Sequence, residues 1–159
     1  MSEPRPGPGD EPFAASMTVL AFDFGEKRIG VAVGESALRS ARPLSVISAA
    51  DNKSRFSAIA ALIAEWQPRL LVVGLPAHPD GTEHELTRLA RRFAQRLEGR
   101  FGIATTLVDE RYTSVSAESG LRERGLSGAR LKSALDAAAA AEILRSYYDT
   151  ASAKTRTGS

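Results

Sequence analysis

Three groups of acidic residues stand where a charged side chain is unusual. Asp23 closes the apolar run VLAFD, and a charge at the end of a buried strand costs free energy unless something neutralises it. Asp109 and Glu110 directly follow a second run, IATTLV. Asp136 lies on the apolar stripe of an alanine-rich helical segment, where acids are uncommon. Carboxylates in such places are candidates for binding cations.

Each acid, taken alone, also has an ordinary structural explanation. Asp23 could begin a turn before Gly25, since Asp is a common turn residue. The two acids after IATTLV could form a solvated strand end. Asp136 could lie near a helix N-terminus, where the helix dipole favours a negative charge. The local patterns leave these alternatives open.

Together, the acids suit a divalent-cation site. The sequence contains no cysteine, which excludes a disulfide scaffold, thiolate metal ligands and a cysteine nucleophile. Clustered carboxylates with oxygen donors alone suit Mg²⁺ or Mn²⁺. Two such ions, about 3.5–4 Å apart, activate a water and stabilise the leaving oxygen in phosphodiester hydrolysis. Only one of Asp109 and Glu110 can share a strand face with Asp23, because successive strand residues face opposite ways.

Hydrophobic periodicity indicates the elements that would position these acids. We expect strands at MTVLAFDFG (17–25), RIGVAVGE (28–35), PLSVIS (43–48), LLVVG (70–74) and 103–108. We expect helices at Lys53–Trp66, from Thr82 to about Leu97, at Thr113–Arg124 and at Arg130–Tyr148. In the second of these helices Arg88, Arg91, Arg92 and Arg96 lie opposite the apolar stripe, and we expect them to form a solvated face rather than an RNA-binding one.

The order of the elements predicts an α/β fold with a five-stranded mixed sheet flanked by helices. The first three strands follow each other through tight connections, which favours an antiparallel meander. Each of the last two strands is reached through a helical crossover and should lie parallel to a neighbour. The first strand would then be central. The ends of the first and fifth strands and the start of the last helix can converge.

Length and composition fit one domain with two short tails. Residues 1–16 are rich in proline, glycine and acids and are predicted to be a disordered tail, not a signal peptide. The folded domain is expected at 17–149 and a polar tail at 150–159. No apolar run approaches roughly 18 residues, so we expect a cytoplasmic protein without a membrane span. The net charge of +2 permits a nucleic-acid partner without demanding one.

Four segments carry a resemblance to a known family. DFGEKRIGVAVGE, VVGLPAHPDGT, VDERYTSVSA and LDAAAAAEIL, in this order and spacing, strongly resemble the YqgF family. The resemblance covers about Met17 to Asp149. Its members are described as Holliday-junction-resolvase-like proteins and as nucleases of precursor 16S ribosomal RNA. The family has an RNase H-like fold, which agrees with the order of elements above.

The resemblance implies a metal-dependent nuclease that uses Mg²⁺ or Mn²⁺ and processes precursor ribosomal RNA. By resemblance, Asp23, Glu110 and Asp136 are the catalytic and metal-binding acids, with Asp109 as the alternative to Glu110. The residues expected to bind nucleic acid are Lys27, Arg28, Arg111, Thr113 and Ser114. From the local pattern alone, Lys27 and Arg28 could instead decorate a hairpin, and Thr113 could cap a helix.

Other functions stay open. A Holliday-junction resolvase acting on branched DNA is the main alternative, but Ala139 stands where resolvases of the wider superfamily carry a further acid. That difference argues for a three-carboxylate site in which Asp23 bridges both ions. A non-catalytic ribosome-assembly module is a second alternative. An ATPase related to actin-like kinases would need two such domains. The oligomeric state is expected to be a monomer or, for a resolvase-like role, a homodimer.

Overall fold

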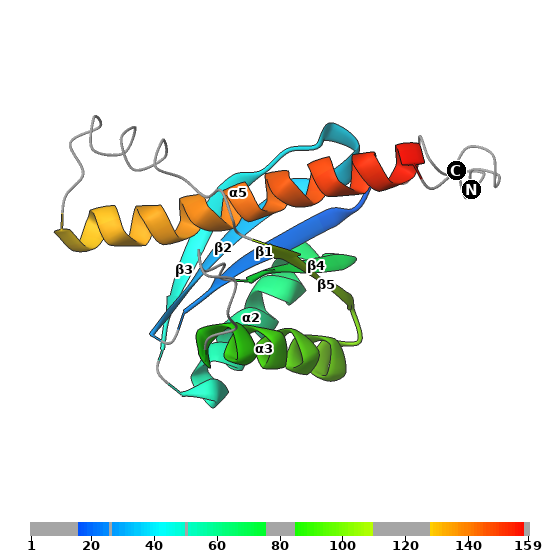
Figure 1. The fold of residues 1–159 in the computed structure, drawn as a ribbon. Coiled ribbons are helices and arrows are strands. Elements are labelled where there is room, and N and C mark those ends of the chain that lie inside the picture. Colours follow the sequence, from blue (N-terminus) through cyan, green and yellow to red (C-terminus); the bar gives the residue numbers. More distant parts are fainter. Residues whose placement is uncertain (1–15, 26, 50, 76–84, 110–127, 158–159) are drawn as a thin grey trace, which may run out of the picture.

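The structure is a computed structural model that describes residues 16–25, 27–49, 51–75, 85–109 and 128–157. Within these residues, three strands come first and are followed by three long helices that alternate with two further strands (Figure 1). They are β1 (Thr18–Phe24), β2 (Arg28–Glu35), the short 3₁₀ helix η1 (Ser36–Leu38), β3 (Arg42–Ser48), α2 (Asn52–Trp66), β4 (Leu70–Leu75), α3 (Glu85–Phe101), β5 (Ala104–Asp109) and α5 (Gly128–Thr157).

The strands form one sheet in the order β3-β2-β1-β4-β5. β1 pairs antiparallel with β2, and β2 pairs antiparallel with β3. β4 lies parallel to β1 on the other side, and β5 lies parallel to β4. The predicted mixed sheet is therefore confirmed, and β1 is its central strand.

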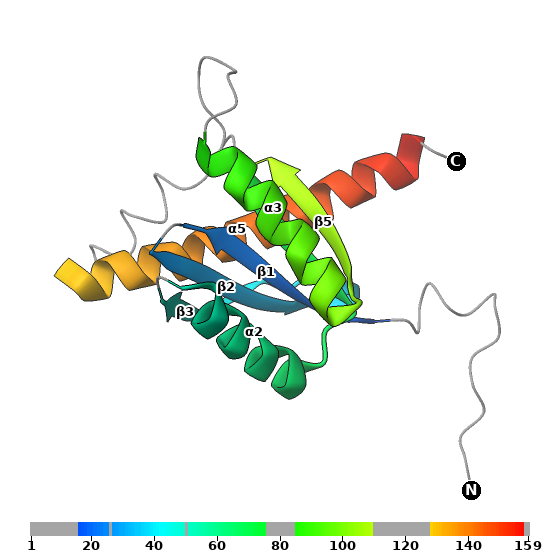
Figure 2. The same ribbon diagram turned by 90° about the horizontal axis from the view of Figure 1, so that it is seen from below.

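Helices cover both faces of the sheet. α5 crosses one face, while α2 and α3 lie side by side on the other (Figure 2). Successive side chains of β1 pack on opposite faces of the sheet. Val19 and Ala21 pack in the hydrophobic cluster under α5, and Leu20 and Phe22 pack in the cluster that faces α2 and α3. A central strand that is buried on both faces needs a continuous apolar run, as its sequence has.

Helix ends follow ordinary capping chemistry. The Asp51 carboxylate accepts a hydrogen bond from the Ser54 backbone at 2.9 Å and caps α2, and this bond lowers the pKa of Asp51. Gln67 ends the helix with a left-handed backbone at φ 47°, just before Pro68. α3 ends in the same way at Gly102, whose φ is 64°. The chain therefore reverses direction after α2 and after α3 and enters β4 and β5.

Some bounds differ from the expectation. α5 runs on to Thr157, so much of the segment expected to be a polar tail is helical. The 3₁₀ helix η1 was not expected. The helix expected at Thr113–Arg124 and the proposed cap at Thr82 lie outside the described residues. Within the part of the chain that the structure describes, no helix is both long enough and apolar enough to span a membrane.

Candidate active site

Asp23 lies at the end of β1, on the face that α5 covers. It follows Val19 and Ala21 in the alternation of β1, and both of these pack under α5. Its cross-strand partners are Gly30 on β2 and Gly74 on β4. Both neighbours are glycines, so no side chain from the adjacent strands lies directly beside the Asp23 carboxylate. Asp23 is partly exposed, whereas the preceding residues of β1 are buried.

Asp136 is brought to the same place by a close backbone contact. A Cβ atom built on Gly30 would lie 1.9 Å from the carbonyl oxygen of Asp136, so no other residue fits there without displacing α5. Gly30 is the direct partner of Asp23 across the β1–β2 ladder. The two predicted acids therefore meet on one face of the sheet, on either side of Gly30. Gly30 was not among the residues predicted to shape the site.

The Asp136 carboxylate forms an ion pair with Arg28. Nε of Arg28 lies 3.1 Å from Oδ2 of Asp136, and the two side chains are 27% and 28% exposed. Arg28 precedes Gly30 by two residues on β2 and so faces the same helix. Oδ2 itself is buried and accepts no hydrogen bond from the described residues, because the Arg28 contact lacks hydrogen-bond geometry. Arg28, expected to contact phosphate, here contacts an acid of the site.

The third acidic group consists of Asp109 and Glu110, and the structure describes only Asp109. Val108 packs under α5 and pairs with Gly74, whereas Asp109 pairs with Leu75, which packs in the core over α2 and α3. The side chain of Asp109 therefore lies on the face opposite Asp23. Four predicted site residues lie outside the described residues: Glu110, Arg111, Thr113 and Ser114. Among the described residues, no three His, Cys, Asp or Glu side chains gather into a metal-binding group.

The turn after Asp23 is held by Arg55, which the sequence analysis missed. Arg55 is 5% exposed and reaches from the first turn of α2 under the hairpin. Its Nη2 donates to the carbonyl of Gly25 at 3.1 Å, and its Nε donates to the carbonyl of Ala49 at 2.7 Å. Its guanidinium also lies 5.5 Å from the centre of the Phe24 ring. The only signal in the sequence is an arginine beside Phe56 on the apolar face of the helix.

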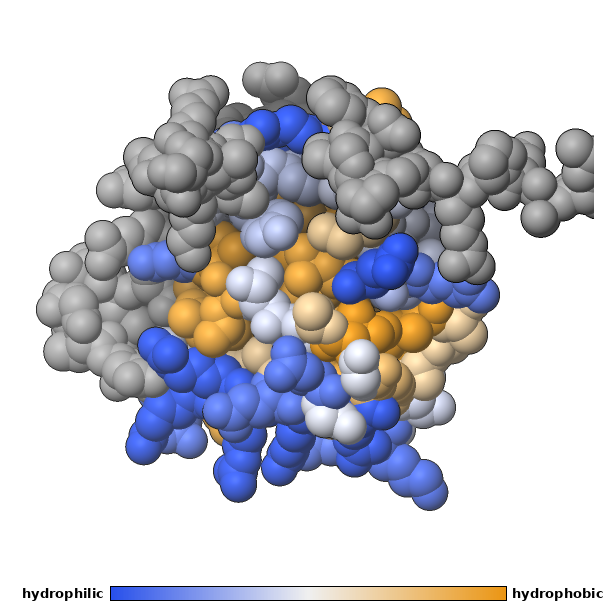
Figure 3. Space-filling view, turned by 90° about the vertical axis from the view of Figure 1, so that its right-hand side faces the viewer, coloured by the Kyte–Doolittle hydropathy of each residue, from blue (hydrophilic) through white to orange (hydrophobic). Residues whose placement is uncertain are grey.

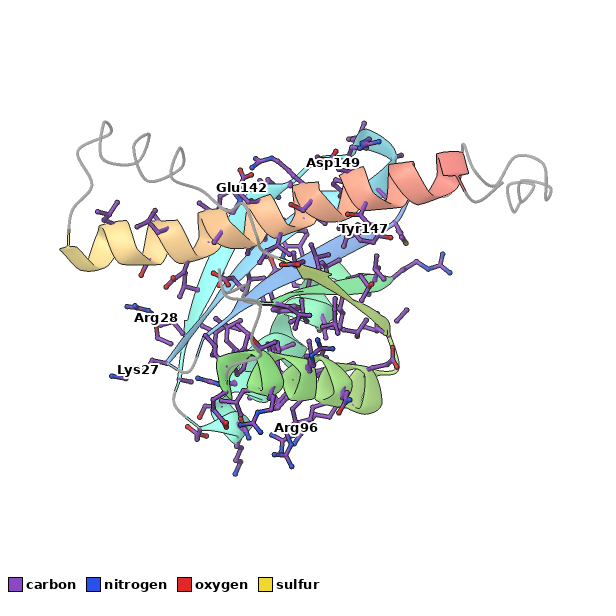
Figure 4. All side chains as sticks on the ribbon, viewed as in Figure 1. Lys27, Arg28, Arg96, Glu142, Tyr147 and Asp149 are labelled. Atoms are coloured by element: carbon purple, nitrogen blue, oxygen red, sulfur yellow. The ribbon has the colours of Figure 1, made fainter. Side chains whose placement is uncertain are left out.

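Lys27 and Arg28 form the exposed side of this hairpin (Figure 4). Lys27 is exposed and points away from the protein, while Arg28 is partly buried toward α5.

A separate groove of about 480 Å³ lies between β5 and α5 and is lined by Thr106, Leu107, Val108, Asp109, Ser146, Tyr147 and Thr150. Its α5 residues begin almost three helical turns beyond Asp136, so the groove lies apart from the two acids.

This sheet order, with an acid at the end of the central strand and another on the helix across it, defines an RNase H-like fold. A solved structure with the same architecture is "T. thermophilus RuvC in complex with Holliday junction substrate". It superimposes with a TM-score of 0.54 at 20% sequence identity, over 86% of this chain and 96% of that one. This likeness extends to the fold.

The family follows from sequence similarity. A family model described as RuvX, Holliday junction resolvase, matches residues 17–150. A protein of Nitrosomonas europaea is 59% identical over 136 residues, which are 86% of this chain and 92% of the relative. A protein of Methylobacillus flagellatus is 57% identical over 140 residues, 87% and 96% of the two chains. Both bear the name "Putative pre-16S rRNA nuclease". This chain belongs to the RuvX family, the YqgF family of the sequence analysis.

Proposed function

We propose that this protein is a metal-dependent nuclease that hydrolyses phosphodiester bonds in the precursor of 16S ribosomal RNA, in the cytoplasm. The observation that carries the proposal is the convergence of Asp23 and Asp136 across Gly30. Carboxylates that face a phosphate backbone repel it unless cations intervene, so paired acids fit hydrolysis better than simple binding. The names of relatives that match nearly the whole folded region support the choice of substrate.

The donor atoms of the site fit Mg²⁺ or Mn²⁺. Both acids offer hard oxygen ligands, and the buried Oδ2 of Asp136 lacks the hydrogen bond that a buried oxygen normally has. We propose Asp23, Asp136 and Glu110 as the ligands, and the position of Asp109 on the face opposite Asp23 supports the choice of Glu110 over Asp109. When bound, two such ions would activate a water and stabilise the leaving oxygen.

The remaining site residues would bind and orient the substrate. Lys27 stands exposed at the hairpin beside Asp23, where its ammonium can contact a phosphate. Arg28 pairs with Asp136 in this structure, and a cation bound at Asp136 would release its guanidinium to bind a phosphate. For Arg111, Thr113 and Ser114 the proposal rests on their motif alone. We propose that the protein acts as a monomer, because an RNA strand has no two-fold symmetry that would demand a homodimer.

Cleavage of branched DNA is the second candidate. It is favoured by the description of the family model as a Holliday junction resolvase. It is opposed by Ala139 on α5, which offers no fourth carboxylate one turn from Asp136. A junction is two-fold symmetric, so this function would also require a homodimer.

The decisive experiment compares both substrates under defined metal conditions. Purified protein is incubated with precursor 16S ribosomal RNA and with a four-way DNA junction, in Mn²⁺, in Mg²⁺ and in chelator. We expect cleavage of the RNA with either metal and none in chelator. Asp23→Asn, Asp136→Asn and Glu110→Gln should each lower the rate by at least about a hundredfold, because each removes a charge that acts on the transition state.

Asp109→Asn is the matched control, since it changes the neighbouring acid on the opposite face of β5. It should cleave at nearly the parental rate. Cleavage of the junction but not of the RNA would replace the first candidate with the second. Undiminished cleavage by all three site variants would show that the acids are assigned wrongly.

A further inference from the structure

The outward face of α3 carries a concentration of positive charge. Five arginines on this helix are exposed: Arg88, Arg91, Arg92, Arg96 and Arg100. The residues that α3 buries contain no charge: Thr87, Ala90, Phe93, Ala94 and Leu97. In Figure 3, hydrophilic side chains project from the lower side of the molecule, where α2 and α3 lie. We call Arg88, Arg91, Arg92 and Arg96 the arginine face.

The charge on α3 is segregated from the rest of the chain. Five arginines and two glutamates give the helix a net charge of +3, whereas the whole chain has +2. The residues outside α3 therefore sum to −1. A mild overall excess of cations would need no explanation, but a one-sided excess of this kind is the electrostatic footprint of a polyanion partner.

The acids of α3 do not neutralise this face. Glu85 pairs with Arg88 within the first turn. Glu98 is used elsewhere, since its carboxylate accepts a hydrogen bond from the backbone of Thr105 at 3.1 Å. Within the described part of the chain no acid forms an ion pair with Arg92 or Arg96. Arg92 and Arg96 are thus available to an external anion.

The spacing of the arginines opposes helix stability and suits a strand of phosphates. Arg88, Arg92 and Arg96 follow each other at intervals of four residues, and like charges at this interval repel. The same interval advances about 6 Å along the helix, comparable with the separation of successive phosphates in an RNA strand. Arg88, Arg91 and Arg92 also line a shallow hollow with Gln95. Guanidinium groups bind phosphate oxygens in a bidentate manner.

A protein partner fits this face less well. The exposed residues of α3 include no apolar side chain, and stable protein interfaces are centred on buried aromatic or aliphatic anchors. The guanidinium of Arg100 lies 4.3 Å from the centre of the Phe56 ring, which is 4% exposed. Leu89, which lines the hollow beside the arginines, is partly buried. The face therefore offers mainly charge and hydrogen bonds, which is the composition expected for backbone phosphates.

The arginine face begins at the edge of the sheet where the acids lie. β1 and β4 run parallel and end at this edge, and α3 is the next described element after β4. Arg88 is in the first turn of α3, and Arg96 points away from the sheet farther along the helix (Figure 4). Asp23 lies on the other face of the sheet, and Lys27 is on the β1–β2 hairpin at this same edge. A strand that extends from the acids to α3 would pass around this edge.

We infer that the arginine face binds the phosphate backbone of the RNA substrate outside the scissile bond, as an exosite for the strand that leaves the active site. The inference rests on the proposed function for the identity of the substrate. It predicts that affinity depends on RNA length, because a short RNA held at the acids does not reach Arg92 and Arg96. It replaces the expectation that these arginines form only a solvated face.

The test is equilibrium binding of fluorescent single-stranded RNA in Ca²⁺, which binds carboxylate oxygens as Mg²⁺ does, with a gel to check that the RNA stays intact. Arg92→Gln/Arg96→Gln is compared with Arg42→Gln/Arg69→Gln, which removes the same charge from exposed arginines at the opposite edge of the sheet. Two RNAs are used, one of about 25 nucleotides and one of about 5. Melting curves check the fold, and removing like charges from α3 should not lower Tm.

For the long RNA we expect the α3 variant to raise Kd about tenfold. The plot of the logarithm of the association constant against the logarithm of salt concentration should become less steep by about 1.4, which is about 0.7 for each lost contact. The control variant should stay within about twofold of the parent, and neither variant should change binding of the short RNA. An effect of the α3 variant no larger than that of the control, or an equal loss with the short RNA, overturns the inference.

The two proposals can fail separately. If the protein does not cleave precursor RNA but the α3 variant still loses affinity selectively for the long RNA, the proposed nuclease function is wrong and the exosite stands. If the protein cleaves precursor RNA and the α3 variant binds long RNA as tightly as the parent, the nuclease function stands and the exosite is wrong.

Discussion

Gly30 on β2 and Asp136 on α5 touch through their backbones, although they lie more than a hundred residues apart in the sequence. A Cβ atom on Gly30 would lie 1.9 Å from the Asp136 carbonyl oxygen. The height of α5 above the sheet is therefore set at the point where β2 pairs with Asp23. The distance between the two acids depends on the absence of a side chain at this position.

We expect Gly30→Ala to separate the two acids. The added methyl group must displace α5 or β2, and overpacking of this kind costs about 1–3 kcal/mol of the free energy of unfolding. Metal-dependent cleavage should fall further than the loss of stability accounts for, because a shift of about 1 Å in a catalytic group can cost about a hundredfold in rate. Melting temperature and cleavage rate measure the two effects.

Gly99→Ala is the control for this change. A Cβ atom on Gly99 would meet nothing within 4 Å, and the residue lies inside α3, where alanine is favoured over glycine by up to about 1 kcal/mol. It should raise Tm and leave cleavage unchanged. A Gly30→Ala protein that melts and cleaves like the parent would refute the close contact between β2 and α5.

Metal binding should be visible as thermal stabilisation, without any substrate. A ligand at a hundred times its Kd stabilises the native state by about 2.7 kcal/mol. For a domain of this size that corresponds to a rise in Tm of about 5–10 °C. We expect Mn²⁺ to produce such a rise in the parent and chelator to reverse it.

Asp23→Asn and Asp136→Asn should lose most of this metal-dependent rise. Asp149→Asn should keep it, because Asp149 is an exposed acid of the same helix that pairs with Arg39, far from the site. An equal rise in all four proteins would mean that the ion binds elsewhere, and the proposed ligands would then be wrong.

Arg28 and a divalent ion would compete for the Asp136 carboxylate. The ion pair is partly exposed, so its contribution to stability is about 0–1 kcal/mol and Arg28→Gln should change Tm only slightly. The Mn²⁺ concentration that gives half of the thermal stabilisation should fall, because the competing cation is gone. A higher half-saturating concentration would instead show that Arg28 orients Asp136 for the metal.

The sheet could be predicted from the sequence because its signals, the apolar runs and the lengths of the connections, each lie within a short stretch of the chain. The compact apolar runs of β1 and β4 identify buried strands, and the lengths of the connections fix which neighbours are parallel. Asp23 stood out for the same reason, as a charge inside such a run.

The end of α5 was predicted too early at Tyr148, because apolar periodicity stops there. The next helix-stopping residue in the sequence is Gly158, just after Thr157.

The contacts that position the acids could not be predicted, because they depend on how α5 and α2 sit against the sheet. Arg28 was assigned to phosphate from its place beside Asp23, and its ion pair with Asp136 needs the height of α5 over β2. Arg55 looks like an ordinary surface arginine until α2 is docked under the hairpin. Gly30 is one of 13 glycines in the sequence, and only packing distinguishes it.

Tyr148 should make stability depend on pH in the alkaline range. Its hydroxyl donates a hydrogen bond to the Ser40 carbonyl at 2.8 Å, and the ring is buried under α5. Burial disfavours the phenolate and, with the negative charge of Glu35, raises the pKa of Tyr148 to about 12. In the unfolded chain a tyrosine has a pKa of about 10.

The sign of the effect follows from these two values. Below pH 10 both states hold the proton and Tyr148 adds no pH dependence. Between about pH 10 and pH 12 the unfolded chain releases the proton while the folded protein keeps it, so stability falls as pH rises, by roughly 2–3 kcal/mol in all.

Denaturant unfolding of the parent and Tyr148→Phe from pH 7 to pH 12 measures this contribution. At neutral pH the variant should be less stable by about 1 kcal/mol, because the Ser40 carbonyl loses its donor. Above pH 10 the difference should shrink and then change sign, because the variant has no proton to lose. Tyr147→Phe removes a phenol from the same turn and should follow the parent. A constant difference across the whole range would show that Tyr148 titrates alike in both states.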